Sequence, residues 1–236
     1  MRRASSRSGI ARKNREHRYK IRFWKDRLKG VPAFIVGCAP SVLDHDLSLL
    51  EDFFTIGINR SYKLFHVSSP SIIFWQDSSF FRTDGDKIHN LESIKVCRDI
   101  ADPQRLYYNF HHKPGEYKFD SEKPHVLYGS QSSGLLSLQF AISVIGCFPV
   151  IIVGMDAKLG KNGEQDFYGD NTFWLKDSLK MMENGMKTLK DICPVEIINC
   201  SDSDLWPRQK LSDVVKMFPE YAFGKKEYTK RLLGDI

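Results

Sequence analysis

Two short apolar runs, each ended by small or polar residues, constrain the fold of this chain more than any other feature. Residues 33–37 read AFIVG, and residues 150–153 read VIIV before the sequence GMD. Strands that are apolar at every position are buried on both faces, as in parallel sheets covered by helices. We expect further strands at residues 53–58, 71–75, 94–96 and 195–199.

The predicted strands alternate with segments that favour helices. The clearest begins at the polar residues 130–134 and continues to residue 145, after which Gly146 and Pro149 break the helix. Alternating strands and helices predict an α/β fold, with a mostly parallel, Rossmann-like sheet and helices on both faces. The other expected helices span residues 14–29, 43–50 and 171–192, and polar loop is expected at residues 82–93.

The length of 236 residues suits one domain, which we place at residues 31–236. Residues 99–129 are rich in Pro, Tyr and His and poor in pattern, so they are a candidate lid or acceptor-facing insertion. A hydrophobic content of 42% excludes a disordered chain. No apolar run reaches about 18 residues and the N-terminus lacks an apolar signal core, so we expect no transmembrane segment and no secretory signal.

The five cysteines are scattered and form no C-x-x-C pair, which favours reduced thiols in a cytoplasm over a disulfide framework. They also lack metal-ligand spacing with a nearby His, so no metal site is expected. We therefore expect a cytoplasmic protein, in the cytoplasm of a host cell if the chain is viral.

Positive charge is concentrated in residues 1–30, which we interpret as a basic N-terminal arm. These residues hold 12 of the 35 Lys and Arg residues but only 2 of the 29 Asp and Glu residues, a net charge of +10, which leaves 23 minus 27, or −4, for residues 31–236. The arm suits an anionic partner, either nucleic acid or a membrane surface, although a solvated basic tail has the same composition. The candidate anion-binding residues are Arg12, Lys13, Arg15, Arg18, Lys20, Arg22 and Lys25.

Ligands of open α/β sheets bind beyond the carboxyl ends of the strands, and the candidate binding residues follow predicted strands or begin a predicted helix. The small residues of the loop 37–41 allow its backbone to approach a phosphate at a helix start. The Asn59 amide can bind a phosphate or ribose, while a carboxylate at Asp156 needs a partner at the end of so apolar a strand. The candidate donor-binding residues are Gly37, Cys38, Ala39, Pro40, Ser41, Asn59, Arg60, Ser132, Ser133, Gly134 and Asp156.

Several of these candidates also have a purely structural interpretation. The loop 37–41 matches neither G-x-G-x-x-G nor the P-loop pattern, and it would serve equally well as a turn. Asn59 is a common residue type after a strand. Residues 132–134 would simply cap a helix, a contribution of about 1 kcal/mol that needs no ligand.

Taken together, the blocks resemble those of the sialyltransferases of glycosyltransferase family 42 and of the related clan that includes 6-hydroxymethylpterin diphosphokinases and many phage proteins. Residues 37–41 stand for the G-x-G-P-S loop of the family, with Ala39 in place of the second Gly. Residues 56–59 stand for its strand-plus-Asn block, residues 132–134 for its [TN]-S-G helix start, and residues 154–156 for its G-[MI]-D strand end.

The resemblance implies a modified Rossmann fold that binds a nucleotide-activated sugar without a metal or other cofactor. The first loop and Asn59 would hold the phosphates of the donor. Ser133, Gly134 and Asp156 would lie near its nucleoside.

The resemblance also implies a general base in the loop after the fourth block. In the family this base is a His, but here the stretch from Asp166 to Asp170 reads DFYGD and contains none. Asp166 is the candidate replacement, a weaker base than His at its unperturbed pKa. Tyr168 is the candidate for stabilising the leaving phosphate. Asp77, which follows the predicted strand at 71–75, is the alternative base.

These features favour a glycosyltransferase that transfers a sugar from a nucleotide sugar to an acceptor hydroxyl. The basic arm favours a DNA acceptor, for example a hydroxymethylated pyrimidine in phage DNA, which the enzyme would flip from the duplex. The alternatives are synthesis of a surface glycan at an anionic membrane, phosphoryl or pyrophosphoryl transfer from ATP, and a catalytically inactive nucleotide-binding module.

Overall fold

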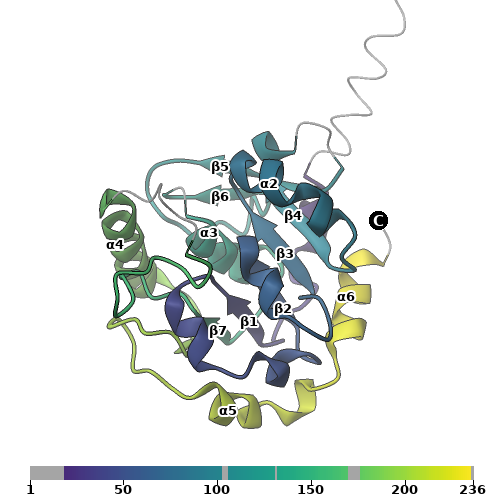
Figure 1. Ribbon diagram of the computed structural model, residues 1–236. Helices are drawn as coiled ribbons and strands as arrows, with labels where there is room; N and C mark the ends of the chain where they lie inside the picture. Colours follow the sequence, from purple (N-terminus) through teal and green to yellow (C-terminus); the bar gives the residue numbers. More distant parts are fainter. Residues whose placement is uncertain (1–18, 103–105, 131, 170–175, 235–236) are drawn as a thin grey trace, which may run out of the picture.

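The computed structural model describes residues 19–102, 106–130, 132–169 and 176–234 (Figure 1). Its strands form one parallel sheet in the order β6-β5-β4-β3-β2-β1-β7-β8. The predicted α/β fold with a parallel sheet is confirmed. The strands are β1 (Ala33–Val36), β2 (Thr55–Ile58), β3 (Ile72–Trp75), β4 (Ile94–Arg98), β5 (Tyr108–Lys113), β6 (Val126–Tyr128), β7 (Val150–Val153) and β8 (Ile197–Asn199).

The strand order reverses next to β1, which pairs with β2 on one side and with β7 on the other. Val36, the last residue of β1, lies beside Gly57 of β2 and beside Val153, the last residue of β7. Because all three strands run in the same direction, the loops that follow them emerge at one edge of the sheet. Such a reversal is the place where open α/β sheets bind ligands.

Both faces of the sheet are buried, because successive side chains along each strand point to opposite sides. Ile35 belongs to the core on one face, whereas Phe34 and Val36 belong to the core on the other. The first face is covered by α3 (Ser133–Gln139) with the π-helix Phe140–Val144 that continues it, α4 (Lys176–Ile192) and α6 (Lys225–Leu233). The second face is covered by α2 (Ser78–His89), α5 (Leu211–Val214) and the 3-10 helices Pro40–Asp44 and Leu47–Leu50.

Residues 19–30, a predicted part of the basic arm, contribute side chains to the core of the domain. Ile21, Trp24 and Leu28 are completely buried in the core of the first face, while Arg22 and Lys25 between them are exposed. The dense charges conceal an apolar stripe at helical spacing. The described part of the helix expected over 14–29 holds one 3-10 helix, Lys20–Trp24, followed by turns.

The structure bears on only part of the predicted anion-binding set. Arg22 and Lys25 are exposed and Lys20 is half-buried. The remaining candidates, Arg12, Lys13, Arg15 and Arg18, lie outside the described residues.

Within the segment 99–129, residues 108–113 and 126–128 form β5 and β6 and belong to the sheet. Tyr108 pairs with Val96 of β4, and the ring of Phe110 stacks on Phe74 of β3 with centroids 4.9 Å apart. The hydrophobic alternation of β5 is broken by its histidines, of which His112 is buried and donates from Nε2 to the carbonyl oxygen of Gly129 at 2.9 Å. This polar burial hides the strand from a hydrophobicity pattern.

Three other predicted elements differ from the structure. Residues 82–93, expected as loop, lie largely in α2, whose buried face carries Phe80 and Ile88. The helix expected over 43–50 is the pair of 3-10 helices, broken at His45. The helix expected over 171–192 begins, in the described part of the chain, at Lys176. The remaining 3-10 helices are Asn59–Leu64, Asp99–Ala101, Val215–Met217 and Pro219–Tyr221.

Candidate functional site

A pocket lies at the carboxyl ends of β1, β2 and β7, where the strand order reverses. Its empty volume, which includes the part open to solvent, is about 640 Å³. Five segments of the chain meet there: the loops after β1, β2 and β7, the start of α3 and one side of α4. The lining residues are Gly37, Cys38, Ala39, Ile58, Asn59, Ser132, Ser133, Gly134, Gly154, Met155, Ala157, Lys158, Gln165, Asp166, Tyr168, Leu179 and Met182.

The loops after β1 and β7 are in direct backbone contact. The Gly37 N–H donates to the carbonyl oxygen of Val153 at 2.8 Å, and the Ala39 N–H donates to that of Gly154 at 3.0 Å. A Cβ atom at Gly37 would lie 2.2 Å from the Gly154 carbonyl oxygen, so only glycine fits at position 37. The small residues of the predicted loop therefore permit two strand ends to meet at the base of the pocket.

Gly37, Cys38 and Ala39 line the pocket as predicted, but the last two residues of the loop do not. Pro40 begins the 3-10 helix Pro40–Asp44. Ser41 is buried beside Asp156, whose carboxylate accepts hydrogen bonds from the Ser41 N–H (3.1 Å) and the Ser41 hydroxyl.

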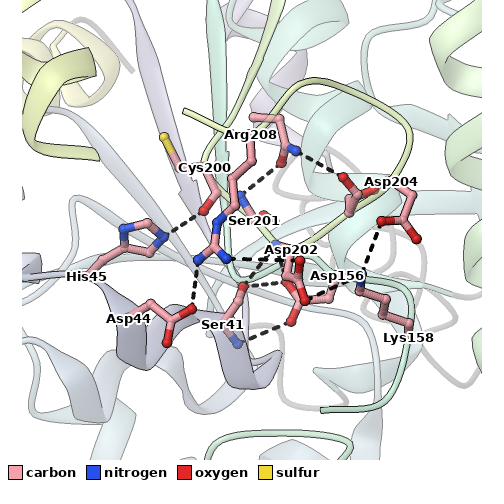
Figure 2. Close-up of polar contacts among 12 residues, drawn as sticks. Ser41, Asp44, His45, Asp156, Lys158, Cys200, Ser201, Asp202, Asp204 and Arg208 are labelled. Carbon is pink, nitrogen blue, oxygen red and sulfur yellow. Dashed lines mark hydrogen bonds and ion pairs between the residues drawn. The ribbon is translucent and has the colours of Figure 1, made fainter. Parts of the chain in front are cut away.

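Asp156 is buried and is not part of the pocket lining. Figure 2 shows it among its hydrogen-bonding partners. Asp156 is 5% exposed, and its carboxylate also accepts the backbone N–H of Asp202 at 3.0 Å. Three donors from two segments thus satisfy the charge that the sequence pattern left without a partner. Its oxygens bind the loops after β1 and β8.

Asn59 and the start of α3 face each other across the pocket wall. The Ser133 hydroxyl donates to the Asn59 side-chain oxygen at 3.4 Å. Asn59 has a φ of 49°, a left-handed conformation that Asn tolerates better than most residues. Ser132 caps α3, its hydroxyl accepting the Leu135 N–H at 3.5 Å. Both roles weighed in the sequence, capping and pocket lining, therefore apply to this serine.

Arg60, a predicted donor-binding residue, is not itself part of the pocket lining but contacts a residue that is. Its Nε donates to the carboxylate of Asp84 at 2.9 Å, and its guanidinium lies 4.9 Å from the ring centre of Tyr168. Burial of Asp84 opposes ionisation, but bonds from Thr83, Tyr62 and Arg60 outweigh it and hold the pKa of Asp84 below its ordinary value. The Arg60 guanidinium therefore packs against the ring of Tyr168.

The loop after β7 brings Asp166 and Tyr168 to the pocket, where the sequence placed them. The Phe167 N–H donates to the carbonyl oxygen of Cys38 at 2.9 Å, which fastens this loop to the one after β1. Asp166 is 6% exposed and accepts the N–H groups of Tyr168 (3.2 Å) and Gly169 (2.9 Å) on one oxygen. Its carboxylate is thus positioned by the backbone of its own turn.

The thiol of Cys38 is held by a hydrogen bond beside the pocket. The thiol donates to the carbonyl oxygen of Ile58 at 3.2 Å. Burial and the nearby negative charge of Asp166 raise the pKa of Cys38 to about 12. The thiol is therefore neutral, and it is a packing and hydrogen-bonding group rather than a nucleophile.

Asp77, the alternative base, is not part of the pocket lining. It lies at the end of β3 and precedes α2. Burial raises the pKa of Asp77, although the charge of Arg98 opposes the shift. The structure thus brings together Asp166 and Tyr168 but not Asp77.

Five lining residues were not identified from the sequence: Ala157, Lys158, Gln165, Leu179 and Met182. Lys158 stands two residues after the G-[MI]-D block, so a search for cations beside this block would have found it. Leu179 and Met182 belong to the apolar stripe of α4, which predicts burial but not which cavity the side chains reach.

Two further properties of the described residues concern partners of the site. No group of three or more His, Cys, Asp or Glu side chains in the described ranges has a geometry suited to a metal ion. Every helix in the same ranges is too short or too polar to cross a bilayer.

No protein-family model matches the chain, and no curated protein sequence does so either. Two solved structures of the sialyltransferase CstII from Campylobacter jejuni resemble it. The complex with CMP-3FNeuAc is 17% identical, covers 72% of this chain and 81% of its own, and has a TM-score of 0.44. The complex with cytidine-5'-monophosphate is 14% identical, covers 82% and 99%, and has a TM-score of 0.46.

The MAf glycosyltransferase from Magnetospirillum magneticum AMB-1 covers more of the chain. It is 13% identical and covers 94% of this chain with a TM-score of 0.50. The match spans 44% of the MAf chain, so it concerns less than half of that protein. The chain described here therefore has the α/β fold that the MAf glycosyltransferase contains.

Proposed function

We propose that this protein is a glycosyltransferase that transfers a sugar from a nucleotide-sugar donor to an acceptor hydroxyl. One observation carries the proposal: the pocket where the strand order reverses combines a small-residue loop, an amide, serine hydroxyls and a buried carboxylate. The shared fold with a glycosyltransferase agrees with it but does not by itself indicate the reaction.

The donor occupies the pocket in an orientation that its lining suggests. The phosphates lie over the loop at Gly37 and Ala39 and near the amide of Asn59, where the backbone can approach closely. The nucleoside lies toward Ser133 and Gly134 at the start of α3. Asp156 has no contact with the donor in this arrangement, and it keeps the loops after β1 and β8 in place.

Asp166 is the proposed general base. The acceptor hydroxyl oxygen forms a bond to the anomeric carbon of the sugar while its proton passes to the Asp166 carboxylate. The bond between the anomeric carbon and the phosphate oxygen breaks, and its electron pair leaves with the nucleotide. The hydroxyl of Tyr168 lies on the same loop and stabilises the charge that develops on the phosphate.

The proposed acceptor is DNA that carries a hydroxymethylated pyrimidine, as in a phage genome. Its support is the sequence of the arm, since residues 1–18 alone hold seven Lys and Arg residues and one Glu. Binding through such an arm weakens as salt rises, because counterions are released from the phosphates. Affinity for DNA that is independent of salt would contradict this acceptor. It would favour a glycan acceptor for the same pocket.

A thermal-shift screen tests the function directly. The protein is melted with CMP, UMP, UDP, GDP, ATP and the matching nucleotide sugars, with and without Mg²⁺. We expect one pyrimidine nucleotide and its sugar to raise the melting temperature without Mg²⁺. Stabilisation by ATP that requires Mg²⁺ would instead favour phosphoryl transfer. If no nucleotide changes the melting temperature, the proposed nucleotide site is wrong.

A further inference from the structure

Lys158 is a charged residue of the pocket lining that has no role in the proposed transfer step. Of the described residues that line the pocket, it alone is positively charged, and Asp166 alone is negatively charged. A nucleotide sugar adds further negative charge through its phosphates. A cation close by would offset the repulsion between an anionic donor and a neighbouring carboxylate.

The backbone before Lys158 is fixed in a way that directs this side chain. Asp156 is held by three hydrogen bonds, and Ala157, which is buried, has a φ of 56°. Residues other than Gly seldom adopt this conformation, and it persists only where the surrounding structure imposes it. The hydrogen bonds of Asp156 and the turn at Ala157 therefore set the direction of the backbone at Lys158, in the loop after β7.

The ammonium group of Lys158 is held by two carboxylates of the loop after β8 (Figure 2). Its Nζ lies 3.3 Å from Asp202 and 3.2 Å from Asp204. Burial disfavours the charged lysine, but the two carboxylates outweigh it and hold the pKa of Lys158 above its ordinary value. Lys158 is thus charged, and the two carboxylates position its ammonium group.

These ion pairs are of the kind that a ligand can replace. The side chain of Asp204 is 88% exposed and that of Asp202 is 51% exposed, so water screens both pairs and each is weak. Asp202 also lies 3.9 Å from Arg208, which keeps a cation beside it when Lys158 moves. The pairs therefore position the lysine without binding it strongly.

We propose that Lys158 binds the phosphate of the nucleotide donor, and that Asp202 and Asp204 hold its ammonium group in place until the nucleotide enters. This inference rests on the proposed nucleotide-sugar site and adds to it the residue that supplies the positive charge. The shared recognition chemistry is a charge-assisted hydrogen bond between an ammonium group and a phosphate oxygen.

Calorimetric titration of four proteins tests the inference: the wild type, Lys158→Gln, Asp204→Asn and Lys161→Gln. The titrants are CMP and UDP, each compared with its own nucleoside, cytidine and uridine. Lys161 is exposed on the same loop and does not line the pocket, so its replacement removes the same charge without the proposed contact. Melting curves show whether each variant is folded.

We expect Lys158→Gln to weaken nucleotide binding by roughly tenfold or more, the effect of losing one hydrogen bond to a charged group. We expect Asp204→Asn to tighten it by about two- to fivefold, because a competing weak ion pair is removed. Nucleoside affinities and the Lys161→Gln variant should remain near the wild type.

The possible failures are distinct. If the wild type binds a nucleotide and Lys158→Gln binds it equally well, the role of Lys158 is overturned while the proposed function stands. An equal loss in Lys161→Gln, or an equal loss of nucleoside affinity in Lys158→Gln, would also overturn it. If the wild type binds none of these nucleotides, the proposed function fails and this inference fails with it.

Discussion

The carboxylate of Asp156 accepts the backbone N–H of Ser41 at 3.1 Å, although the two residues are 115 positions apart in the chain. This bond joins the loop after β1 to the end of β7, at the place where the strand order reverses. The same carboxylate accepts the N–H of Asp202 from the loop after β8. One buried side chain thus connects three loops beside the pocket, and its replacement should affect stability before it affects chemistry.

Replacing Asp156 with Ala should lower the free energy of unfolding by roughly 2–4 kcal/mol, because buried donors of Ser41 and Asp202 lose their acceptor. Urea unfolding followed by circular dichroism measures the change. Asp204→Ala is the matched control, since that carboxylate is 88% exposed and its loss should change stability by no more than about 0.5 kcal/mol. Equal midpoints for the two variants would contradict the anchoring role.

Gly37→Ala should disrupt the pocket and destabilise the domain by more than about 2 kcal/mol. The added methyl carbon would lie 2.2 Å from the carbonyl oxygen of Gly154, which is backbone and cannot rotate away. Gly163→Ala is the control for the cost of placing alanine in a left-handed backbone conformation without a clash. Gly163 has a φ of 84°, but a Cβ atom there would have no neighbour within 4 Å. The cost of this substitution should be about 1 kcal/mol, from backbone conformation alone. Comparable losses in both variants would contradict a close approach of the two loops.

Much of this fold was predictable because its central strands are apolar at every position. β1 and β7 follow from such runs, and their order with the intervening helices gives the parallel sheet. The pattern fails where burial is polar or where charges interrupt an apolar stripe. β5 carries a buried histidine, His112, and residues 19–30 hide three buried apolar side chains among Lys and Arg.

The sequence predicted which segments form the candidate site, but not how individual side chains in those segments are oriented. The sequence places Asn59, Ser133 and Asp166 near one edge of the sheet, and all three line the pocket. It does not show that the Asp156 carboxylate binds the loops after β1 and β8 or that Lys158 is part of the pocket lining. Those placements depend on hydrogen bonds between distant loops and on the turn at Ala157, which no local pattern encodes.

Stability should fall as the pH drops below the ordinary histidine pKa, and His112 should contribute to the fall. Its side chain is 3% exposed, and burial lowers the pKa of His112 below 6.5 despite the bond to the Gly129 carbonyl. The unfolded chain therefore takes up a proton below pH 6.5 that the folded chain does not. The stability present above pH 6.5 is lost as the pH falls toward the lower, folded-state value.

Urea midpoints at pH 7.5 and pH 5.5 measure this dependence in the wild type and in His112→Gln. We expect a smaller difference between the two pH values in the variant. His66→Gln is the control, because His66 is exposed and its replacement should leave the dependence intact. A dependence that is the same in all three proteins would show that His112 does not contribute.

Deletion of residues 1–18 and deletion of residues 1–30 should have different effects. The longer deletion removes the fully buried Ile21, Trp24 and Leu28, each worth about 1.5–3 kcal/mol of burial, and the domain should not fold stably. The shorter deletion leaves them in place and should melt near the full chain. It should nevertheless lose affinity for duplex DNA and show a shallower dependence of that affinity on salt. Unchanged DNA binding after the shorter deletion would exclude the arm as the binding element.

Asp166→Asn should abolish transfer while leaving the donor bound. The amide oxygen of Asn can still accept the N–H groups of Tyr168 and Gly169, so the loop keeps its shape, but the side chain can no longer take a proton. We expect the rate of nucleotide release from the donor sugar, with acceptor present, to fall by roughly 10²–10⁴. The thermal shift caused by the nucleotide should persist. Asp77→Asn is the control, because Asp77 lies outside the pocket lining and its rate should stay near the wild type. A large loss in Asp77→Asn with normal turnover in Asp166→Asn would reverse the assignment of the base.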